Sequence, residues 1–477
     1  MDLKRFTISQ IHHLYKSGQL KPVELIEEYL ERLKDSQPVT NSFIDIFEDY
    51  ALERARELEK FLMEKQELPL LYGIPVGIKD NINFKGFPTT CASRILSGYK
   101  SLYNATVVEH ILEEGGIIIG KLNMDEFAMG ALGTYSFYGP VRNPNNPDYL
   151  AGGSSSGSAS SVAAGEVHVS LGSDTGGSIR LPASYCGVYG LKPTYGRVSR
   201  YGLVAFASSL DQIGPFARNV EDLARTFVTI AGFDPRDSTS FQIEKPELKD
   251  LLKPLNPREM VLGYPDFLEE ARVDGRVQKN FEETLSLLEK SGFKLKKVSM
   301  PHIKYSVEVY QIIAMSEASS NLLRFDGIRY GLRKREETLE GLYVKTRGEG
   351  FGKEVKRRIV VGTFALSHGY YDAYYLRALR VRRLIKEDIE NAFKEVNLII
   401  LPVAPSLPPK LEENIDPVSA YYLDLFTIPA NLAGIPAMAI PFGRTEENLP
   451  LGFQVMAPAW GEGLLFNFAY FFEKLTT

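Results

Sequence analysis

The first part of the chain carries two amphipathic patterns. Residues 20–34 bring leucine, isoleucine and tyrosine side chains to one face of a helix, because positions three and four apart share a face. Pro22 suits the first turn of that helix. Residues 48–65 repeat the pattern with more charged positions. The spacing therefore predicts two helices that wrap a larger body.

Short apolar runs that end in glycine-rich loops begin at residue 72. The runs at 72–81, 116–123 and 166–178 predict strands, and the segment 106–116 predicts a helix. Strand, helix and strand in succession are typical of a parallel or mixed sheet in an α/β protein. The apolar run at 397–405 predicts a further strand.

Small residues and prolines mark two segments that we expect to be buried. Residues 154–165 are almost all serine, alanine and glycine, which predicts a helix packed very close to its neighbours. Residues 425–443 contain several prolines, so they suit a buried loop and strand better than a membrane helix. Charged helical patterns dominate residues 257–400.

Neither an internal repeat nor a long linker divides the sequence. We therefore expect one α/β domain over residues 1–477. Within it, residues 1–70 form a helical wrap, residues 72–215 form the core with the glycine-rich loops, and residues 216–477 add helices and the remaining sheet.

The composition is that of an ordinary soluble globular protein. Of 477 residues, 44% are hydrophobic and 24% charged, and the net charge is −5. Without an overall basic field, a protein that binds tRNA or DNA on its own is disfavoured. Cys91 and Cys186 lie far apart without a CxxC pair, and the charged N-terminus lacks a signal-peptide pattern. We expect a cytoplasmic protein that does not enter a membrane.

Three short patterns resemble known motifs but lack their context. The GxxxxGK pattern at 115–121 has Leu122 where a nucleotide site needs serine or threonine, and its isoleucines favour a buried strand. The GxSxG pattern at 153–157 follows a turn-rich loop instead of the strand that a nucleophile elbow needs. The SxxK pattern at 97–100 has no accompanying SDN or KTG. None of the three predicts a site.

Histidine and cysteine offer one weaker alternative. The histidines have no metal-ligand spacing, so we expect no metal site in this chain. His168 alternates with valines, which favours a structural histidine over a general base. Cys186 and His168 could still form a Cys–His pair for amide hydrolysis, although a small buried cysteine is the more ordinary role.

Two loops are unusually dense in glycine and serine, at 152–157 and 172–178. Glycine lets the backbone approach a ligand and turn its N–H groups inward, which is what an oxyanion hole requires. Apolar segments flank both loops, so they do not read as linkers. A serine nucleophile there needs a base, and a desolvated lysine is one option. Lys79 ends an apolar run where burial would lower its pKa, although a strand-end lysine that reaches water fits the spacing equally well.

Three segments together resemble the amidase signature family. They are GIPVGIKDNI around Lys79, GGSSSGSAS from Gly152 and LGSDTGGSIRLPASYCGVYGLKPT from Leu171, and the likeness runs almost unbroken through residues 72–215. The resemblance implies an α/β amidase signature fold, a large mixed β-sheet covered by helices on both faces. Ser156 is one departure, because the family commonly has glycine at that position.

The resemblance also implies catalytic roles. Ser178 would be the nucleophile, Ser154 the bridging serine that follows a cis peptide bond with Gly153, and Lys79 the base. Ser155 would support the lysine. The N–H groups that would face the oxyanion are those of Thr175, Gly176, Gly177 and Ser178.

Within the family, the segments at 195–215, 316–331 and 362–375 are similar to the glutaminase subunits of tRNA-dependent amidotransferases. This likeness implies that Arg358 binds the α-carboxylate of glutamine and Asp424 its α-ammonium. Tyr310 would line the same pocket. The charge pattern alone places Arg358 on a basic, solvated helix face.

The same likeness implies a function within a complex. The chain would hydrolyse glutamine and supply ammonia to a B subunit, a kinase with ATP and Mg²⁺ that converts Glu-tRNA(Gln) to Gln-tRNA(Gln) and holds most of the tRNA. A small C subunit would complete a heterotrimer, and this chain itself would carry no cofactor. Action on Asp-tRNA(Asn) stays open. The alternatives are a free-standing amidase of the same family and a non-catalytic scaffold subunit.

Overall fold

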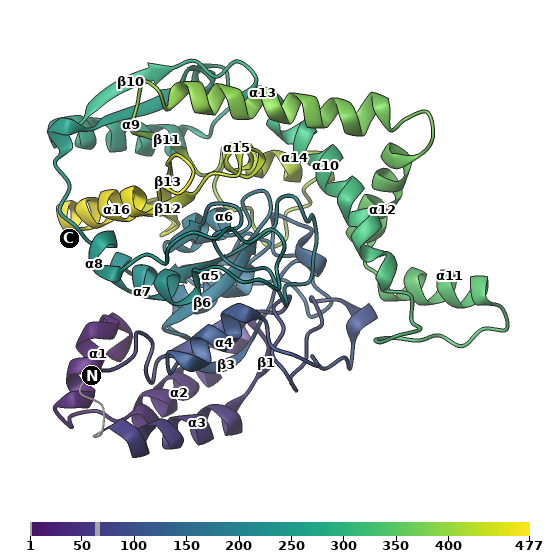
Figure 1. Ribbon diagram of the computed structural model, residues 1–477, viewed down its shortest axis with the longest axis horizontal. Helices are drawn as coiled ribbons and strands as arrows, with labels where there is room; N and C mark the ends of the chain where they lie inside the picture. The colour runs from purple at the N-terminus through teal and green to yellow at the C-terminus, as the bar shows by residue number, and fades with distance from the viewer. Residues whose placement is uncertain (1, 63–66) are drawn as a thin grey trace.

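One long β-sheet runs through the protein (Figure 1). The computed structural model describes residues 2–62 and 67–477. The sheet has eleven strands in the described residues, in the order β1-β3-β2-β6-β8-β7-β12-β13-β11-β9-β10. In that order the strands are Phe43–Ile46, Ile117–Leu122, Pro75–Lys79, Val169–Asp174, Gln212–Ala217, Tyr189–Lys192, Ala437–Arg444, Pro450–Met456, Leu398–Pro402, Val261–Pro265 and Lys294–Val298.

The sheet is mixed, as predicted. Strand β2 pairs parallel with β3 and β6, and β9 pairs parallel with β10 and β11, whereas the central pairs from β6 through β8, β7, β12 and β13 to β11 are antiparallel. Strands β4 (Arg142–Asn143) and β5 (Asn146–Leu150) form a separate two-stranded antiparallel sheet. Because β2 and β6 are parallel neighbours, the loops that follow them leave the same edge of the sheet.

Helices surround this sheet. Those described are α1 (Ile8–Lys16), α2 (Pro22–Thr40), α3 (Glu48–Phe61), α4 (Thr106–Glu113), α5 (Ser156–Ala164), α6 (Arg180–Cys186), α7 (Val220–Ile230), α8 (Leu248–Leu251), α9 (Gly275–Lys290), α10 (Ser306–Asn321), α11 (Leu339–Gly350), α12 (Lys353–Leu366), α13 (Arg377–Ala392), α14 (Pro417–Tyr421), α15 (Ile428–Ala433) and α16 (Glu462–Thr476). None of the helices in the described residues is long and apolar enough to cross a membrane.

Both faces of the sheet are buried at its inner strands, whereas the edge strand β10 is largely exposed. Along β11, Leu398 and Ile400 belong to one hydrophobic cluster, while Ile399 and Leu401 belong to another, because successive side chains of a strand point to opposite faces. The first cluster includes side chains of α2, α7 and α16, and the second includes those of α10, α13 and α15. Helices therefore cover both faces, which confirms the predicted fold class.

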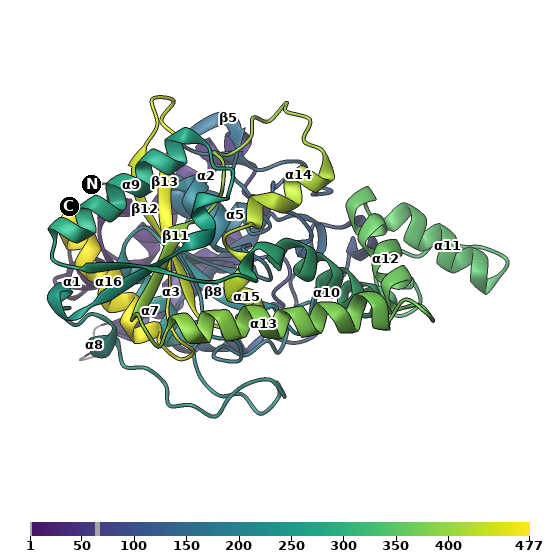
Figure 2. The ribbon, with the colours of Figure 1, turned by 90° about the horizontal axis from the view of Figure 1, so that it is seen from above.

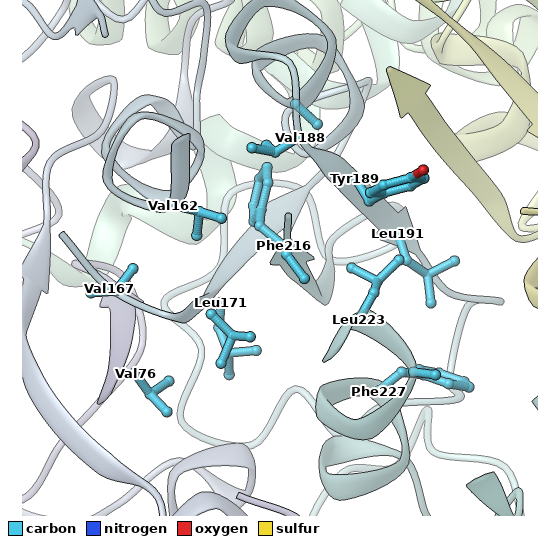
Figure 3. Packing of buried hydrophobic residues seen from close by; sticks show 14 of the residues in the cluster. Val76, Val162, Val167, Leu171, Val188, Tyr189, Leu191, Phe216, Leu223 and Phe227 are labelled. Atoms are coloured by element: carbon cyan, nitrogen blue, oxygen red, sulfur yellow. The ribbon is translucent and has the colours of Figure 1, made fainter. Parts of the chain in front are cut away.

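Close packing in the first cluster comes from strands and helices that are distant in the chain. Figure 3 shows residues of this cluster from several elements: Val76, Leu171 and Phe216 come from three strands, and Leu223 and Phe227 come from α7. All five are fully buried. Burying a side chain of this size contributes roughly 1.5–3 kcal/mol, so the strands that carry the catalytic candidates rest on a rigid support.

The helix of small residues lies at the centre of the site region. Helix α5 confirms the helix predicted over 154–165. A Cβ on Gly157 would lie 2.2 Å from the carbonyl oxygen of Ser42, and one on Gly172 of β6 would lie 2.7 Å from Oγ of Ser155. Small residues are required because backbone and side chains approach this helix closely on two sides.

The periodic segments of the sequence form the elements predicted from them, with different ends. The pattern at 20–34 continues to Thr40 in α2, and α3 covers 48–61 of the second pattern. Residues 63–66 of that pattern lie outside the described residues.

One predicted segment differs in kind. Residues 425–443 contain the short helix α15 before strand β12, where we expected a loop and strand. Pro429 occupies the first turn of α15 and Gly434 ends it in a left-handed conformation. Proline and glycine at these places start and stop a helix, so they concealed it among the loop signals.

Candidate functional site

A buried lysine ends strand β2. Lys79 is fully buried, and its Nζ lies 2.8 Å from Oγ of Ser154, 2.9 Å from Oγ of Ser155 and 2.9 Å from Oγ of Ser173. Burial lowers the pKa of Lys79 to about 7, although nearby carboxylates such as Asp125 oppose the shift. A substantial fraction of the amine is therefore neutral near neutral pH and able to accept a proton.

Ser154 sits in a loop that packs tightly on its surroundings. The peptide bond between Gly153 and Ser154 is cis, as the family resemblance implied. The backbone N–H of Asp125 donates to the carbonyl oxygen of Ser154 at 3.2 Å, and a Cβ on Gly153 would lie 2.0 Å from Oδ2 of Asp125. These contacts hold Oγ of Ser154 against the lysine.

Ser178 lies in the loop between β6 and α6. It is 4% exposed, and its carbonyl oxygen accepts a hydrogen bond from the N–H of Ser155 at 3.1 Å, so the two serine-rich loops touch. Within the described residues, no hydrogen bond joins Oγ of Ser178 to Oγ of Ser154. The structure thus brings Lys79 and Ser154 into direct contact and links Ser178 to them through the backbone.

The loop at 175–178 presents unpaired donors. None of its four N–H groups donates a hydrogen bond to another residue that the structure describes, whereas Ile179 N donates to Asp174. Residues outside the loop hold it in place, because Oγ1 of Thr427 donates to the backbone carbonyl of Gly176 at 2.7 Å and Oγ1 of Thr175 donates to Asp211 at 2.7 Å. A loop fixed in this way can offer N–H groups to a developing oxyanion.

An ion pair between Asp174 and Arg180 flanks this loop. It was not singled out from the sequence. Arg180 is fully buried and donates to both carboxylate oxygens of Asp174, at 3.2 and 3.1 Å. Burial alone would raise the pKa of Asp174, but the Arg180 guanidinium holds it below its ordinary value. The two residues flank the loop inside the segment SDTGGSIR, and that placement was the only signal that could have indicated them.

The three residues predicted to bind glutamine line one narrow pocket. Tyr310 comes from α10, Arg358 from α12 and Asp424 from the turn after α14. The pocket adjoins the loop at 175–178, since a Cβ on Gly176 would lie 2.7 Å from the Tyr310 ring and one on Gly177 would lie 2.7 Å from Oδ1 of Asp424. The other lining residues are Gly130, Ala131, Tyr135, Gln311, Ala420 and Tyr421.

The charged pair in this pocket is buried. Arg358 is 4% exposed, so the interpretation of it as a solvated charge from the pattern alone was wrong. The basic positions of α12 do not share one face, and Arg358 points inward between the rings of Phe206 and Tyr421. Burial, together with the negative charge of Asp174, raises the pKa of Asp424 well above its usual range.

The thiol alternative finds no support in the geometry. Cys186 is buried at the end of α6, burial raises the pKa of its thiol, and its Sγ contacts the carbonyl oxygen of Ala151 at 3.5 Å. His168 instead bonds the hydroxyl of Tyr29 at 2.7 Å and Asp222 at 2.9 Å. The histidine is structural, as its alternation with valines indicated.

The GxxxxGK pattern at 115–121 is also structural. Lys121 of the GxxxxGK pattern lies buried in β3, where its Nζ donates to Oγ1 of Thr89 at 3.0 Å. Within the described residues, no group of three or more histidine, cysteine, aspartate or glutamate side chains could hold a metal ion.

Comparisons with known proteins place this geometry in a family. The amidase family model matches residues 24–466. The chain is 47% identical over 477 residues to the A subunit of glutamyl-tRNA(Gln) amidotransferase from Sulfurihydrogenibium sp., covering 100% of this chain and 98% of that protein. The protein of the same name from Gloeothece citriformis is 48% identical over 471 residues, covering 98% and 97%.

Solved structures agree. The crystal structure of the A subunit of glutamyl-tRNA(Gln) amidotransferase from Thermotoga maritima has a TM-score of 0.80 at 41% identity and covers 99% of this chain and 95% of that one. Native peptide amidase from Stenotrophomonas maltophilia has a TM-score of 0.83 at 27% identity, covering 100% and 98%. With the family model spanning most of the sequence and full-length relatives well above 30% identity, this chain belongs to the amidase family.

Proposed function

We propose that this chain is the glutaminase subunit of a tRNA-dependent amidotransferase. It hydrolyses the side-chain amide of glutamine and supplies ammonia for the ATP-dependent conversion of Glu-tRNA(Gln) to Gln-tRNA(Gln). The observation that carries the proposal is the buried contact between Lys79 and Ser154 beside a loop of unpaired N–H groups. Its full-length likeness to proteins named as the A subunit of that amidotransferase supports the choice of reaction.

The chemistry follows from a proton relay through three side chains. Neutral Lys79 accepts a proton from Ser154, Ser154 takes one from Ser178, and Oγ of Ser178 attacks the amide carbon of glutamine. The N–H groups of the loop at 175–178 stabilise the oxyanion. The relay then runs backwards, so that the proton goes to the leaving nitrogen, the C–N bond breaks and ammonia departs. Water hydrolyses the resulting glutamyl ester by the same relay, and glutamate leaves.

Recognition of glutamine requires two opposite charges at a fixed spacing. Arg358 binds the α-carboxylate and Asp424 binds the α-ammonium, while Tyr310 fills the wall between the pocket and the loop at 175–178. This clamp is what separates a glutaminase from an amidase that accepts other amides. The clamp is supported by the shared pocket of the three side chains.

The complex that uses the ammonia has further subunits. We infer a heterotrimer with B and C subunits in the cytoplasm, in which the B subunit supplies the kinase activity, the ATP and Mg²⁺ site and most of the tRNA contacts. This chain then needs no cofactor of its own. Its net charge of −5 suits that division of labour, because the phosphate backbone of tRNA would be held elsewhere.

Ammonia release tests the proposal. The purified chain is assayed with glutamine alone, and then with the B and C subunits, Glu-tRNA(Gln) and ATP, with Ser178→Ala as the matched control. We expect release that depends on Ser178 and increases with the partners and tRNA. Hydrolysis of some other amide without glutamine turnover would identify a free-standing amidase, and no amide hydrolysis at all would identify a scaffold subunit. Parallel assays with Asp-tRNA(Asn) decide whether that tRNA is also a substrate.

A further inference from the structure

A single carboxylate holds the arginine of the glutamine pocket. Glu354 lies one helical turn before Arg358 on α12, and its Oε1 accepts a hydrogen bond from Nε of Arg358 at 2.8 Å. Glu354 is 2% exposed and Arg358 is 4% exposed. The pair is therefore largely shielded from water, where an ionic hydrogen bond is strong and directional.

The carboxylate of Glu354 connects two further side chains to this arginine. Its Oε1 also accepts from the hydroxyl of Tyr421 at 2.9 Å, and its Oε2 pairs with Nη1 of Arg357. The Tyr421 ring lies 5.2 Å from the Arg358 guanidinium, and the Phe206 ring lies 5.7 Å from it. The guanidinium is thus fixed along one edge and between two rings.

The remaining edge of the guanidinium is left for a ligand. Nη1 and Nη2 of Arg358 donate no hydrogen bond to any residue that the structure describes, and Arg358 lines the pocket with Asp424 and Tyr310. Two parallel N–H groups match the two oxygens of a carboxylate. Since the carboxylate of Glu354 already accepts the N–H of Nε of Arg358, it determines which edge of the guanidinium faces the pocket.

The position of Glu354 near the start of α12 suggests a simpler role, because acidic residues stabilise helix N-termini. Its contacts argue otherwise. The carboxylate accepts hydrogen bonds from the side chains of Arg358, Arg357 and Tyr421, and among the described residues it accepts none from a backbone N–H of its own helix. A group that only capped the helix would have no reason to bind the pocket arginine.

We propose that Glu354 is a positioning residue that orients Arg358 and so sets the requirement for a free α-carboxylate on the substrate. The inference rests on the proposed glutaminase function. Charges balance when glutamine is bound, since Arg357 and Arg358 then face Glu354 and the substrate carboxylate. Removing the Glu354 charge frees Arg358 to rotate and leaves the α-carboxylate with a poorly aligned partner.

The test compares two substrates in the assembled complex. Glu354→Gln and the native chain are assayed for kcat and KM on glutamine and on glutamine α-amide, which lacks the carboxylate charge. Glu340→Gln on α11, exposed in the structure, is the matched control. We expect Glu354→Gln to raise the KM for glutamine about tenfold, with kcat within about twofold and turnover of the α-amide unchanged. The control should behave like the native chain.

Other outcomes would overturn the positioning role of Glu354, and they can be distinguished from a failure of the proposed glutaminase function. If the native complex hydrolyses glutamine and Glu354→Gln has an unchanged KM, Glu354 does not position the clamp, while the glutaminase stands. An equal loss on both substrates would mean a purely structural role. If the native complex does not hydrolyse glutamine, the proposed function itself fails. If the Glu354→Gln chain does not assemble with its partner subunits, Glu354→Asp is used instead. This variant keeps the negative charge but withdraws the carboxylate from Nε of Arg358, so we expect the same selective rise in KM for glutamine.

Discussion

Nζ of Lys79 lies 2.8 Å from Oγ of Ser154, and both residues are fully buried. A lysine in water is protonated at neutral pH and cannot act as a base. Here burial lowers its pKa to about 7, so the contact joins a proton acceptor to a serine hydroxyl. This relationship turns an otherwise ordinary buried polar cluster into a candidate relay.

The pH dependence of glutamine hydrolysis follows from this lysine. Because the neutral amine is the active form, we expect kcat to rise as pH increases through about 7 and to level off above it. Below pH 6 the protonated fraction dominates, and the rate should fall about tenfold per pH unit. The measurement is ammonia release by the assembled complex between pH 5.5 and 9, and a rate that falls as pH rises through 7 would contradict the assignment of the base.

Removing the nucleophile should separate two activities of the complex. Ser178→Ala leaves the amide carbon without an attacking group, so we expect glutamine-dependent formation of Gln-tRNA(Gln) to fall by at least about a thousandfold. Added ammonium chloride should restore tRNA amidation to near the native rate, because the ammonia then bypasses this chain. Aminoacyl-tRNA analysis with each nitrogen donor checks both values. Loss of both activities would indicate that Ser178 supports the complex structurally.

The sequence was sufficient for the elements whose periodicity is strong. Strands β2 and β3 and helix α2 follow from their apolar spacing, since burial on one or both faces dictates that spacing directly. The positions of Lys79 and Ser154 were indicated by motif likeness, and the structure gives the 2.8 Å contact that no pattern contains. The catalytic roles of these residues stay predictions until activity is measured.

Tertiary contacts determine the features of the site that the sequence pattern does not predict. Arg358 lies on a helix whose charge pattern predicts solvated side chains, but it is buried, and its guanidinium lies beside the rings of Phe206 and Tyr421. Glu354 carries no local signal of a role, and Asp174 is indicated only by its place in the segment SDTGGSIR, because the partners of both residues are defined by side-chain geometry. Helix α10 packs against both α12 and α13, and its contact with α12 brings this arginine to the pocket, while α11 extends away from the sheet (Figure 1 and Figure 2).

Gly177 offers a test of how tightly the loop at 175–178 is packed. Its φ is +147°, and a Cβ there would lie 2.2 Å from Oγ1 of Thr427. Gly232 has a φ of +149° with nothing within 4 Å of such a Cβ, so it is a control with matched backbone strain. We expect Gly177→Ala to lower the free energy of unfolding by about 1–3 kcal/mol more than Gly232→Ala, because only the former also creates a clash.

Denaturant unfolding of the two alanine variants gives that difference, and glutamine hydrolysis gives its functional counterpart. Only the change at 177 displaces the N–H groups beside Ser178, so it should reduce kcat by at least about a hundredfold, whereas the change at 232 should leave kcat near the native value. Equal loss of stability in both variants would mean that strain, rather than contact with Thr427, controls this loop.

The raised pKa of the Asp424 carboxyl predicts that glutamine binding releases protons. Burial and the nearby charge of Asp174 raise the pKa of its carboxyl, so ionisation of this side chain is disfavoured in the free protein. The α-ammonium of glutamine favours the ionised carboxylate, and binding therefore drives a proton off. Since higher pH populates the ionised form, the Kd for glutamine should fall as pH rises.

Titration calorimetry on the Ser178→Ala complex measures this linkage without turnover. Binding heats are measured in two buffers of different ionisation enthalpy. They should show a net release of protons for the Ser178→Ala complex and no release when Asp424→Asn is added to it. The asparagine variant should also bind glutamine at least about tenfold more weakly and with little pH dependence, because a neutral amide cannot pair with the ammonium. If Asp424→Asn keeps both the native Kd and the native proton release, the ammonium of glutamine is bound elsewhere in the pocket.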